Sequence, residues 1–193
     1  MSSAPKQAVS ARSAEPERGE GRVSHLFAAG LLALAVLAGV ALLPRVSLAP
    51  AKSAGPAPAF MLPVLHNGEK GSRLSLADLE GQPVLLDFWA TWCGPCAAQT
   101  PILDRLARRY EARGLRVVGI NVADDDPAAA MRYAAKKNLS YPIVLDADGS
   151  VQKEYGVSKL PTLVLVDKRG QVHRVASGLV DEASLDKLIR EIL

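Results

Sequence analysis

The stretch DFWATWCGPCAAQTP, Asp87 to Pro101, contains the only two cysteines of this 193-residue chain. Cys93 and Cys96 are separated by Gly94 and Pro95. Two cysteines at this spacing can form a structural disulfide, supply half of a metal site, or act as a redox couple that alternates between dithiol and disulfide. The residues around the pair decide among these three uses.

The spacing of the cysteines argues against the first two uses. A structural disulfide stabilises a protein more when it closes a longer loop, and this one would close almost none. A zinc site needs four ligands, and the chain adds only His25, His66 and His173 to the two cysteines. We therefore favour a redox couple, and we expect no metal ion and no cofactor other than a redox-active Cys93–Cys96 disulfide.

The residues on either side of the pair predict a strand that leads into a helix. VLLDFW, residues 84–89, is nearly continuous in apolar residues, which is typical of a central buried strand. A helix should start at the cysteines, with Pro95 in its first turn, and run to about Arg113. Amide groups and the helix dipole at this end stabilise a thiolate on Cys93. Cys93 is then the attacking thiol, and Cys96, one turn deeper, resolves the mixed disulfide.

Asp87 is a carboxylate inside this apolar run. Burying a charge is costly, and burial should raise the pKa of the carboxyl group. Such a group is suited to exchange a proton with Cys96, directly or through water. We therefore include Asp87 with Cys93 and Cys96 as a candidate catalytic residue. The alternative is a bulge or an edge strand, where Asp87 would reach solvent.

Predicted strands and helices alternate along the rest of the chain. Strands are predicted at residues 60–65, 84–89, 116–122, 143–145, 162–167 and 172–176, and helical segments at residues 75–81, 93–113, 126–138, 152–155 and 181–193. This order predicts an α/β fold with a mixed β-sheet flanked by helices and a hairpin near its end.

The segment FWATWCGPC, Phe88 to Cys96, resembles the active-site motif of the thioredoxin superfamily. The segment LPT, residues 160–162, precedes the strand TLVLV, where thioredoxin-like folds carry a cis-proline against the cysteines. The resemblance implies a cis peptide at Pro161 and a docking edge for an extended peptide at Leu160. A proline at a strand entrance is the plainer explanation of Pro161. The candidate substrate-binding residues are Trp92, Gly94, Pro95, Leu160 and Pro161.

More narrowly, residues 59–193 resemble the membrane-anchored TlpA/ResA/DsbE-like branch of thiol-disulfide oxidoreductases. The resemblance includes an N-terminal extension, residues 60–93, and a central insert, residues 117–157. It implies an enzyme that reduces disulfides in client proteins, with electrons from a membrane transporter of the CcdA/DsbD type and with apocytochrome c as a frequent client. Gln99 stands where many relatives carry glutamate, and Asp87 where many carry asparagine. These departures bear on the cytochrome c role and leave the redox chemistry intact.

The N-terminal part of the chain predicts a membrane anchor. Residues 1–25 read as a polar cytoplasmic tail, and residues 26–43, LFAAGLLALAVLAGVALL, just reach across a hydrocarbon core of roughly 30 Å. Basic residues before this run keep the N-terminus in the cytoplasm. A linker rich in proline and alanine, residues 44–58, then leads to an extracytoplasmic (periplasmic) domain, residues 59–193. A cleaved signal peptide is the alternative, but the apolar run is longer than its usual core.

Composition and motif spacing weigh against other functions. A net charge of +3, without a run of basic and aromatic residues, gives no support for nucleic-acid binding. A thiol peroxidase is an alternative, although Thr91 lies two residues before Cys93 and not three. A copper-binding or redox-inert module on the same fold is another, although His173 lies past the strand that follows Pro161 and matches a copper ligand poorly.

Overall fold

The computed structural model describes residues 55–69, 71–122 and 126–193. Its elements are β1 (Met61–His66), β2 (Arg73–Ser75), η1 (Leu76–Leu79), β3 (Val84–Trp89), α2 (Gly94–Tyr110), η2 (Glu111–Arg113), β4 (Arg116–Asn121), α3 (Pro127–Lys137), β5 (Ile143–Leu145), α4 (Ser150–Glu154), β6 (Thr162–Val166), β7 (Val172–Ser177) and α5 (Glu182–Ile192). The strands form one sheet in the order β2-β1-β5-β4-β3-β6-β7. Strands β3, β4 and β5 are parallel and the other pairings are antiparallel, which confirms the predicted mixed sheet.

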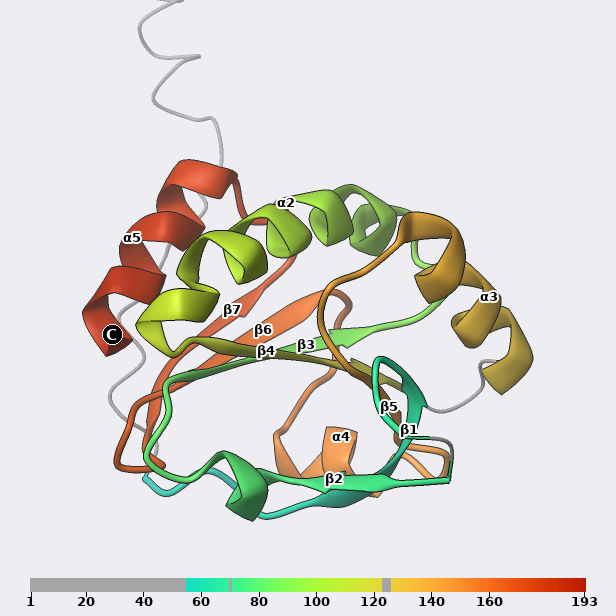
Figure 1. Cartoon of the computed structure of the whole chain (residues 1–193), viewed down its shortest axis with the longest axis horizontal. Coiled ribbons are helices and arrows are strands. Elements are labelled where there is room, and N and C mark those ends of the chain that lie inside the picture. The colour runs from blue at the N-terminus through green and yellow to red at the C-terminus, as the bar shows by residue number, and fades with distance from the viewer. Residues whose placement is uncertain (1–54, 70, 123–125) are drawn as a thin grey trace, which may run out of the picture. The chain divides into compact units, whose positions relative to one another are not determined.

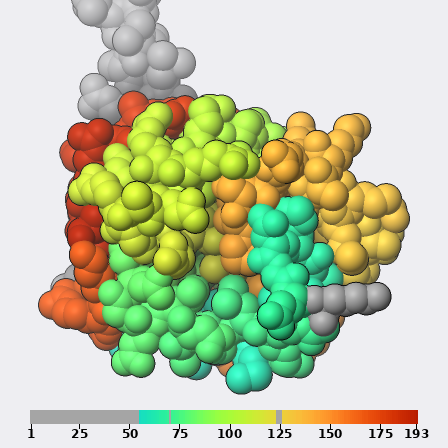
Figure 2. Space-filling view, in the orientation of Figure 1, coloured from blue at the N-terminus to red at the C-terminus, as the bar shows by residue number. Residues whose placement is uncertain are grey.

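Helices cover both faces of this sheet. Helices α2, α3 and α5 lie on one side, and α4 lies on the other (Figure 1). In the space-filling view, α2, α3 and the β1–β2 region lie next to one another on one face of the domain (Figure 2). The two aromatic residues at the end of β3 point to opposite faces, because side chains alternate along a strand. Phe88 packs against Tyr155 beyond α4, and Trp89 packs against Tyr133 of α3.

Strand β3 is central, as the sequence predicts. All six of its residues are buried, and it pairs with β4 on one side and β6 on the other. Helix α2 follows it, begins after Cys93 as the N-cap, and carries Pro95 in its first turn. The sequence predicts a single helix as far as about Arg113. In the structure α2 ends at Tyr110, and Glu111–Arg113 form a separate 3-10 turn. Gly114, with φ of 91°, then ends the segment in the left-handed conformation that glycine adopts without strain.

Strand β2 has no counterpart among the predicted elements. It has three residues, too few to show a period-two pattern, and it pairs antiparallel with β1. Next to it, Ser75 and Asp78 form a capping box at the start of η1, which confirms the predicted short helical turn.

The chain enters the domain through the last residues of the predicted linker. The Val172 N–H donates to the Gly55 carbonyl at 3.0 Å, and the Ala57 N–H donates to the Gly170 carbonyl at 2.9 Å. Gly170 lies in the turn after β6, whereas the other end of β6 begins beside Pro161. The entry point is therefore at the end of the sheet opposite the cysteines.

The predicted tail, anchor and most of the linker lie outside the described residues. Within the described part of the chain, no helix combines the length and apolar character needed to cross a membrane.

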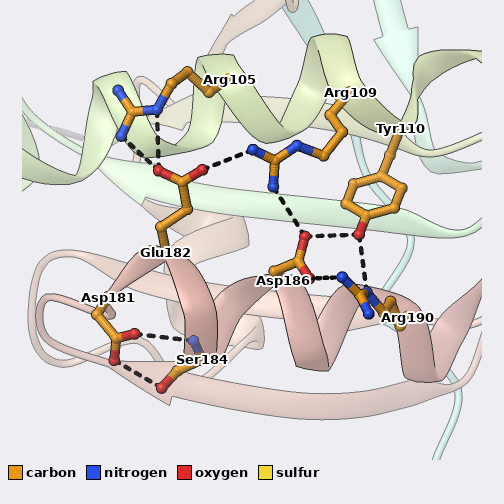
Figure 3. A network of polar contacts seen from close by, with 8 residues as sticks. All are labelled: Arg105, Arg109, Tyr110, Asp181, Glu182, Ser184, Asp186 and Arg190. Atoms are coloured by element: carbon orange, nitrogen blue, oxygen red, sulfur yellow. Dashed lines mark hydrogen bonds and ion pairs between the residues drawn. The ribbon is translucent and has the colours of Figure 1, made fainter.

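A network of charged and polar groups joins α2 to α5 (Figure 3). Glu182 accepts hydrogen bonds from Arg105 at 2.7 Å and from Arg109 at 3.0 Å. Asp186 accepts one from the Tyr110 hydroxyl at 2.7 Å and one from Arg109 at 3.1 Å. The helix that carries the cysteines is thus tied along its second half to the closing helix.

Replacing Asp186 with alanine is expected to lower the free energy of unfolding by about 2–3 kcal/mol. The buried Tyr110 hydroxyl would lose its acceptor, and two arginines would lose a counter-ion. Guanidinium denaturation of the oxidised protein measures the change. Arg132→Ala is the control, because its ion pair with Asp126 is exposed and should contribute less than about 0.5 kcal/mol. Equal effects of the two substitutions on the free energy of unfolding would contradict a stabilising role for the contacts of Asp186.

Candidate active site

A groove of about 570 Å³ opens beside the cysteines. It is lined by Trp92, Cys93, Gly94, Pro95, Val122, Gln152, Ser158, Lys159 and Leu160. Cys93 and Cys96 form a disulfide in this structure. Both are buried, with 5% and 2% of their surface exposed, but Cys93 lines the groove and Cys96 does not. A partner in the groove therefore meets Cys93 first, in agreement with the predicted order of attack.

The start of α2 gives Cys93 a favourable electrostatic setting. Its sulfur accepts a hydrogen bond from the Cys96 N–H at 3.2 Å, in the position of a capping side chain. The first amides of a helix lack partners within the helix, and the helix dipole is positive at this end. The same amide can stabilise a thiolate on Cys93 once the disulfide is reduced.

Four of the five predicted substrate-binding residues, Trp92, Gly94, Pro95 and Leu160, line the groove, and Pro161 follows Leu160 directly in the chain. Trp92 is 61% exposed at the groove, and Leu160 forms part of its lining. The peptide bond between Leu160 and Pro161 is cis, as the resemblance implied. Gly94 and Pro95 complete the wall on the α2 side. Two segments more than 60 residues apart in the chain thus face one groove.

Asp87 lies in the middle of β3 and is only 3% exposed, which rules out the edge or bulge alternative. Its Oδ1 atom has no hydrogen-bond partner among the described residues. Burial raises the pKa of this carboxyl group to about 7. Trp89, two residues on and on the same face, packs on Tyr133, and the Tyr133 hydroxyl bonds Thr100 of α2. The Asp87 side chain therefore points to the side of the sheet that α2 covers.

Close packing surrounds this carboxyl group. Gly119 pairs with Asp87 across β3 and β4. A Cβ atom at Gly119 would lie 2.5 Å from Ile143 Cδ1 and 3.1 Å from Trp89 Nε1, so only glycine fits without displacing these groups. A glycine inside a buried strand is a signal for such an approach, and the sequence carries this signal at Gly119.

Sequence reasoning also missed the role of the loop after β7. Gln99 of α2 is fully buried, and its Oε1 accepts a hydrogen bond from the Val180 N–H at 2.8 Å. The Gly178 N–H in turn donates to the Pro161 carbonyl at 2.8 Å. The sequence flagged Gln99 only as a departure from related proteins, and nothing local indicates which loop it would contact.

Comparison with known proteins identifies the family to which the chain belongs. The family model described as Redoxin matches residues 52–189, most of the chain. The chain belongs to the Redoxin family. This Redoxin-family protein is 32% identical over 136 residues to the thiol-disulfide oxidoreductase ResA of Bacillus thuringiensis subsp. konkukian (strain 97-27), a match that covers 70% of this chain and 76% of that protein.

Solved structures agree with this assignment of the Redoxin-family chain. A putative thiol:disulfide interchange protein DsbE from Chlorobium tepidum is 32% identical, with a TM-score of 0.67 over 73% of this chain and 97% of that chain. A secreted thiol-disulfide isomerase from Corynebacterium glutamicum is 26% identical, with a TM-score of 0.65 over 70% and 84% of the two chains. The thioredoxin-like fold, the TlpA/ResA/DsbE-like branch and the thiol-disulfide oxidoreductase activity are confirmed.

Proposed function

We propose that this enzyme reduces disulfide bonds of client proteins outside the cytoplasm while residues 26–43 hold it at the membrane. The observation that carries the proposal is the Cys93–Cys96 disulfide at the start of α2, with Cys93 in the wall of a groove that is also lined by Leu160, the residue before the cis-proline Pro161. The groove suits an extended segment of polypeptide, because the backbone of Leu160 offers an edge for main-chain hydrogen bonds.

Each turnover moves two electrons from the enzyme to the client. The Cys93 thiolate attacks one sulfur of the client disulfide, the other client sulfur leaves as a thiolate and takes a proton, and a mixed disulfide forms. Cys96 then loses its proton and attacks Cys93, which releases the second client thiol and leaves the Cys93–Cys96 disulfide. A pKa near 7 suits Asp87 to accept the proton of Cys96, because a general base works best when its pKa lies near the ambient pH.

A further observation supports action outside the cytoplasm. The Corynebacterium glutamicum relative is described as secreted. The chain enters the domain at the end of the sheet opposite Cys93. We propose a membrane protein of the CcdA/DsbD type as the electron donor, since the enzyme must be reduced again after each turnover. Apocytochrome c is the client class that we propose to test first.

The reduction potential of the Cys93–Cys96 couple tests the direction of the reaction. We expect a value near that of thioredoxin, about −270 mV, when the full-length protein equilibrates with a dithiol buffer. A difference of about 30 mV changes the equilibrium about tenfold, so the measurement separates the two directions clearly. A value near about −120 mV would identify an oxidant that makes disulfides. Consumption of hydrogen peroxide by the same sample should be negligible compared with reduction of a protein disulfide.

A further inference from the structure

Gln99 has a contact that the redox reaction does not require. It lies three residues after Cys96 on α2, so both side chains are on one face of the helix. The side chain is fully buried, and its Oε1 accepts the Val180 N–H at 2.8 Å. Val180 is itself buried, in the connection between β7 and α5. A buried N–H without an acceptor is costly, so this bond stabilises the connection.

The segment Gly178–Val180, which we call the docking loop, adjoins the groove through Pro161. The Gly178 N–H donates to the Pro161 carbonyl at 2.8 Å. Between the two anchored residues, Leu179 is 53% exposed, one of few large apolar side chains at the surface of the described domain. Hydrogen bonds and the chain itself thus lead from Gln99, through the docking loop, to the cis-proline segment.

The Gln99 amide brings no charge to this position, although its Nε2 is buried without a hydrogen-bond partner among the described residues. Gln99 Oε1 accepts a hydrogen bond at every pH without bringing a charge into a fully buried site. Asp87 is already a buried carboxyl group on the side of the sheet that α2 covers. A second ionised carboxylate nearby would be costly to bury, so a glutamate at this position would stay protonated, and its carbonyl oxygen could still accept the Val180 N–H.

We propose that Gln99 is a positioning residue that holds the docking loop, and through it Leu179 and the Pro161 carbonyl, in register with the cysteines for binding an apolar polypeptide segment. The inference rests on the proposed function, because it concerns how protein clients bind. A loop that is already ordered need not be ordered on binding, which lowers the cost of association.

Reduction kinetics with two substrates test the role of Gln99. Gln99→Met keeps the length of the side chain but removes the acceptor oxygen, and Gln99→Glu keeps an acceptor. The control is Tyr110→Phe, which removes two hydrogen bonds at the far end of the same helix, one to Asp186 and one from Arg190. The substrates are insulin and a small aromatic disulfide, each reduced by the full-length enzyme with dithiothreitol as electron source.

We expect Gln99→Met to raise KM for insulin about tenfold, the equivalent of one buried hydrogen bond, with a smaller change in kcat. The small disulfide, which does not reach the docking loop, should be affected less. Gln99→Glu should restore KM for insulin, and Tyr110→Phe should leave it near the wild-type value. Hydrogen exchange at the Val180 amide should be faster in Gln99→Met alone.

Three outcomes would overturn the inference. They are an unchanged KM for insulin in Gln99→Met, an equal rise of KM for both substrates, and a Gln99→Glu variant as impaired as Gln99→Met. If Gln99→Met does not fold, Leu179→Ala at the exposed tip replaces it and should raise KM for insulin selectively; no change there would also overturn the inference. A wild-type enzyme that reduces neither substrate would instead reject the proposed function, while Val180 exchange would still report on the contact.

Discussion

Replacing Cys96 with serine is expected to lower turnover at least about a thousandfold and to trap the client covalently on the enzyme. Cys93 would still attack a client disulfide, because it lines the groove and retains the helix amide that stabilises its thiolate. The second step would fail, since a serine hydroxyl does not displace the client sulfur. Non-reducing electrophoresis and mass spectrometry of the reduced variant mixed with insulin would detect the adduct.

Cys93→Ser is the matched variant. It should lose turnover to the same extent but form little adduct, because Cys96 is 2% exposed and does not line the groove. Alkylation of the reduced protein by a bulky reagent should likewise occur first at Cys93. An adduct in Cys93→Ser and none in Cys96→Ser would reverse the two roles.

Replacing Asp87 with asparagine is expected to stabilise the folded protein at neutral pH by up to about 4 kcal/mol. The pKa of Asp87 is about 7 in the folded state, against an ordinary value of 3.8 for a free aspartate side chain. Between these values the folded state keeps the proton and the unfolded state has lost it, so stability falls as pH rises. The loss is about 1.4 kcal/mol for each pH unit, and it ends near the folded pKa.

Denaturation of the oxidised wild type and of Asp87→Asn between about pH 4 and pH 8 measures this difference. The two proteins should have similar stability near pH 4, and the variant should become progressively more stable toward pH 7. Asp186→Asn is a control, because its effect on stability should have the opposite sign. The hydrogen bond from Tyr110 lowers the pKa of Asp186, whereas burial raises the pKa of Asp87. That variant should be less stable at neutral pH, and its deficit should shrink as pH falls. A constant difference between wild type and Asp87→Asn at every pH would show that burial does not raise the pKa of Asp87.

The same substitution should slow the enzyme while it stabilises the fold. Asparagine cannot accept the proton of Cys96, so release of the client from the mixed disulfide is expected to become slower near neutral pH. Opposite effects on stability and on rate are typical of a residue retained for function.

The local pattern of the sequence determined most of the secondary structure. Residues 84–89 form the buried strand that their apolar run predicts, and the bounds agree to the residue. In α5, the four apolar residues at helical spacing are all buried: Leu185, Leu188, Ile189 and Ile192. Capping residues also act locally, as at Asp126, whose side chain accepts the Ala128 N–H at the start of α3. These features can be predicted from the sequence because each involves residues that are close together in the chain.

The motif around the cysteines also determined the chemistry of the site. Two cysteines with two residues between them, at the boundary of a strand and a helix, indicated a redox couple before any tertiary contact was known. The segment at Leu160 and Pro161 could be assigned to the same site only through resemblance to a family, since nothing in its own residues points to Cys93.

The tertiary structure decided what depends on neighbours distant in the chain. Asp87 is buried because β4 and β6 flank it and helices cover its face, and this burial raises its pKa. Gln99 contacts Val180, 81 residues away. Strand β2 exists because β1 lies beside it. The energy of such contacts depends on desolvation and on the position of a specific partner, which no local pattern of residues encodes.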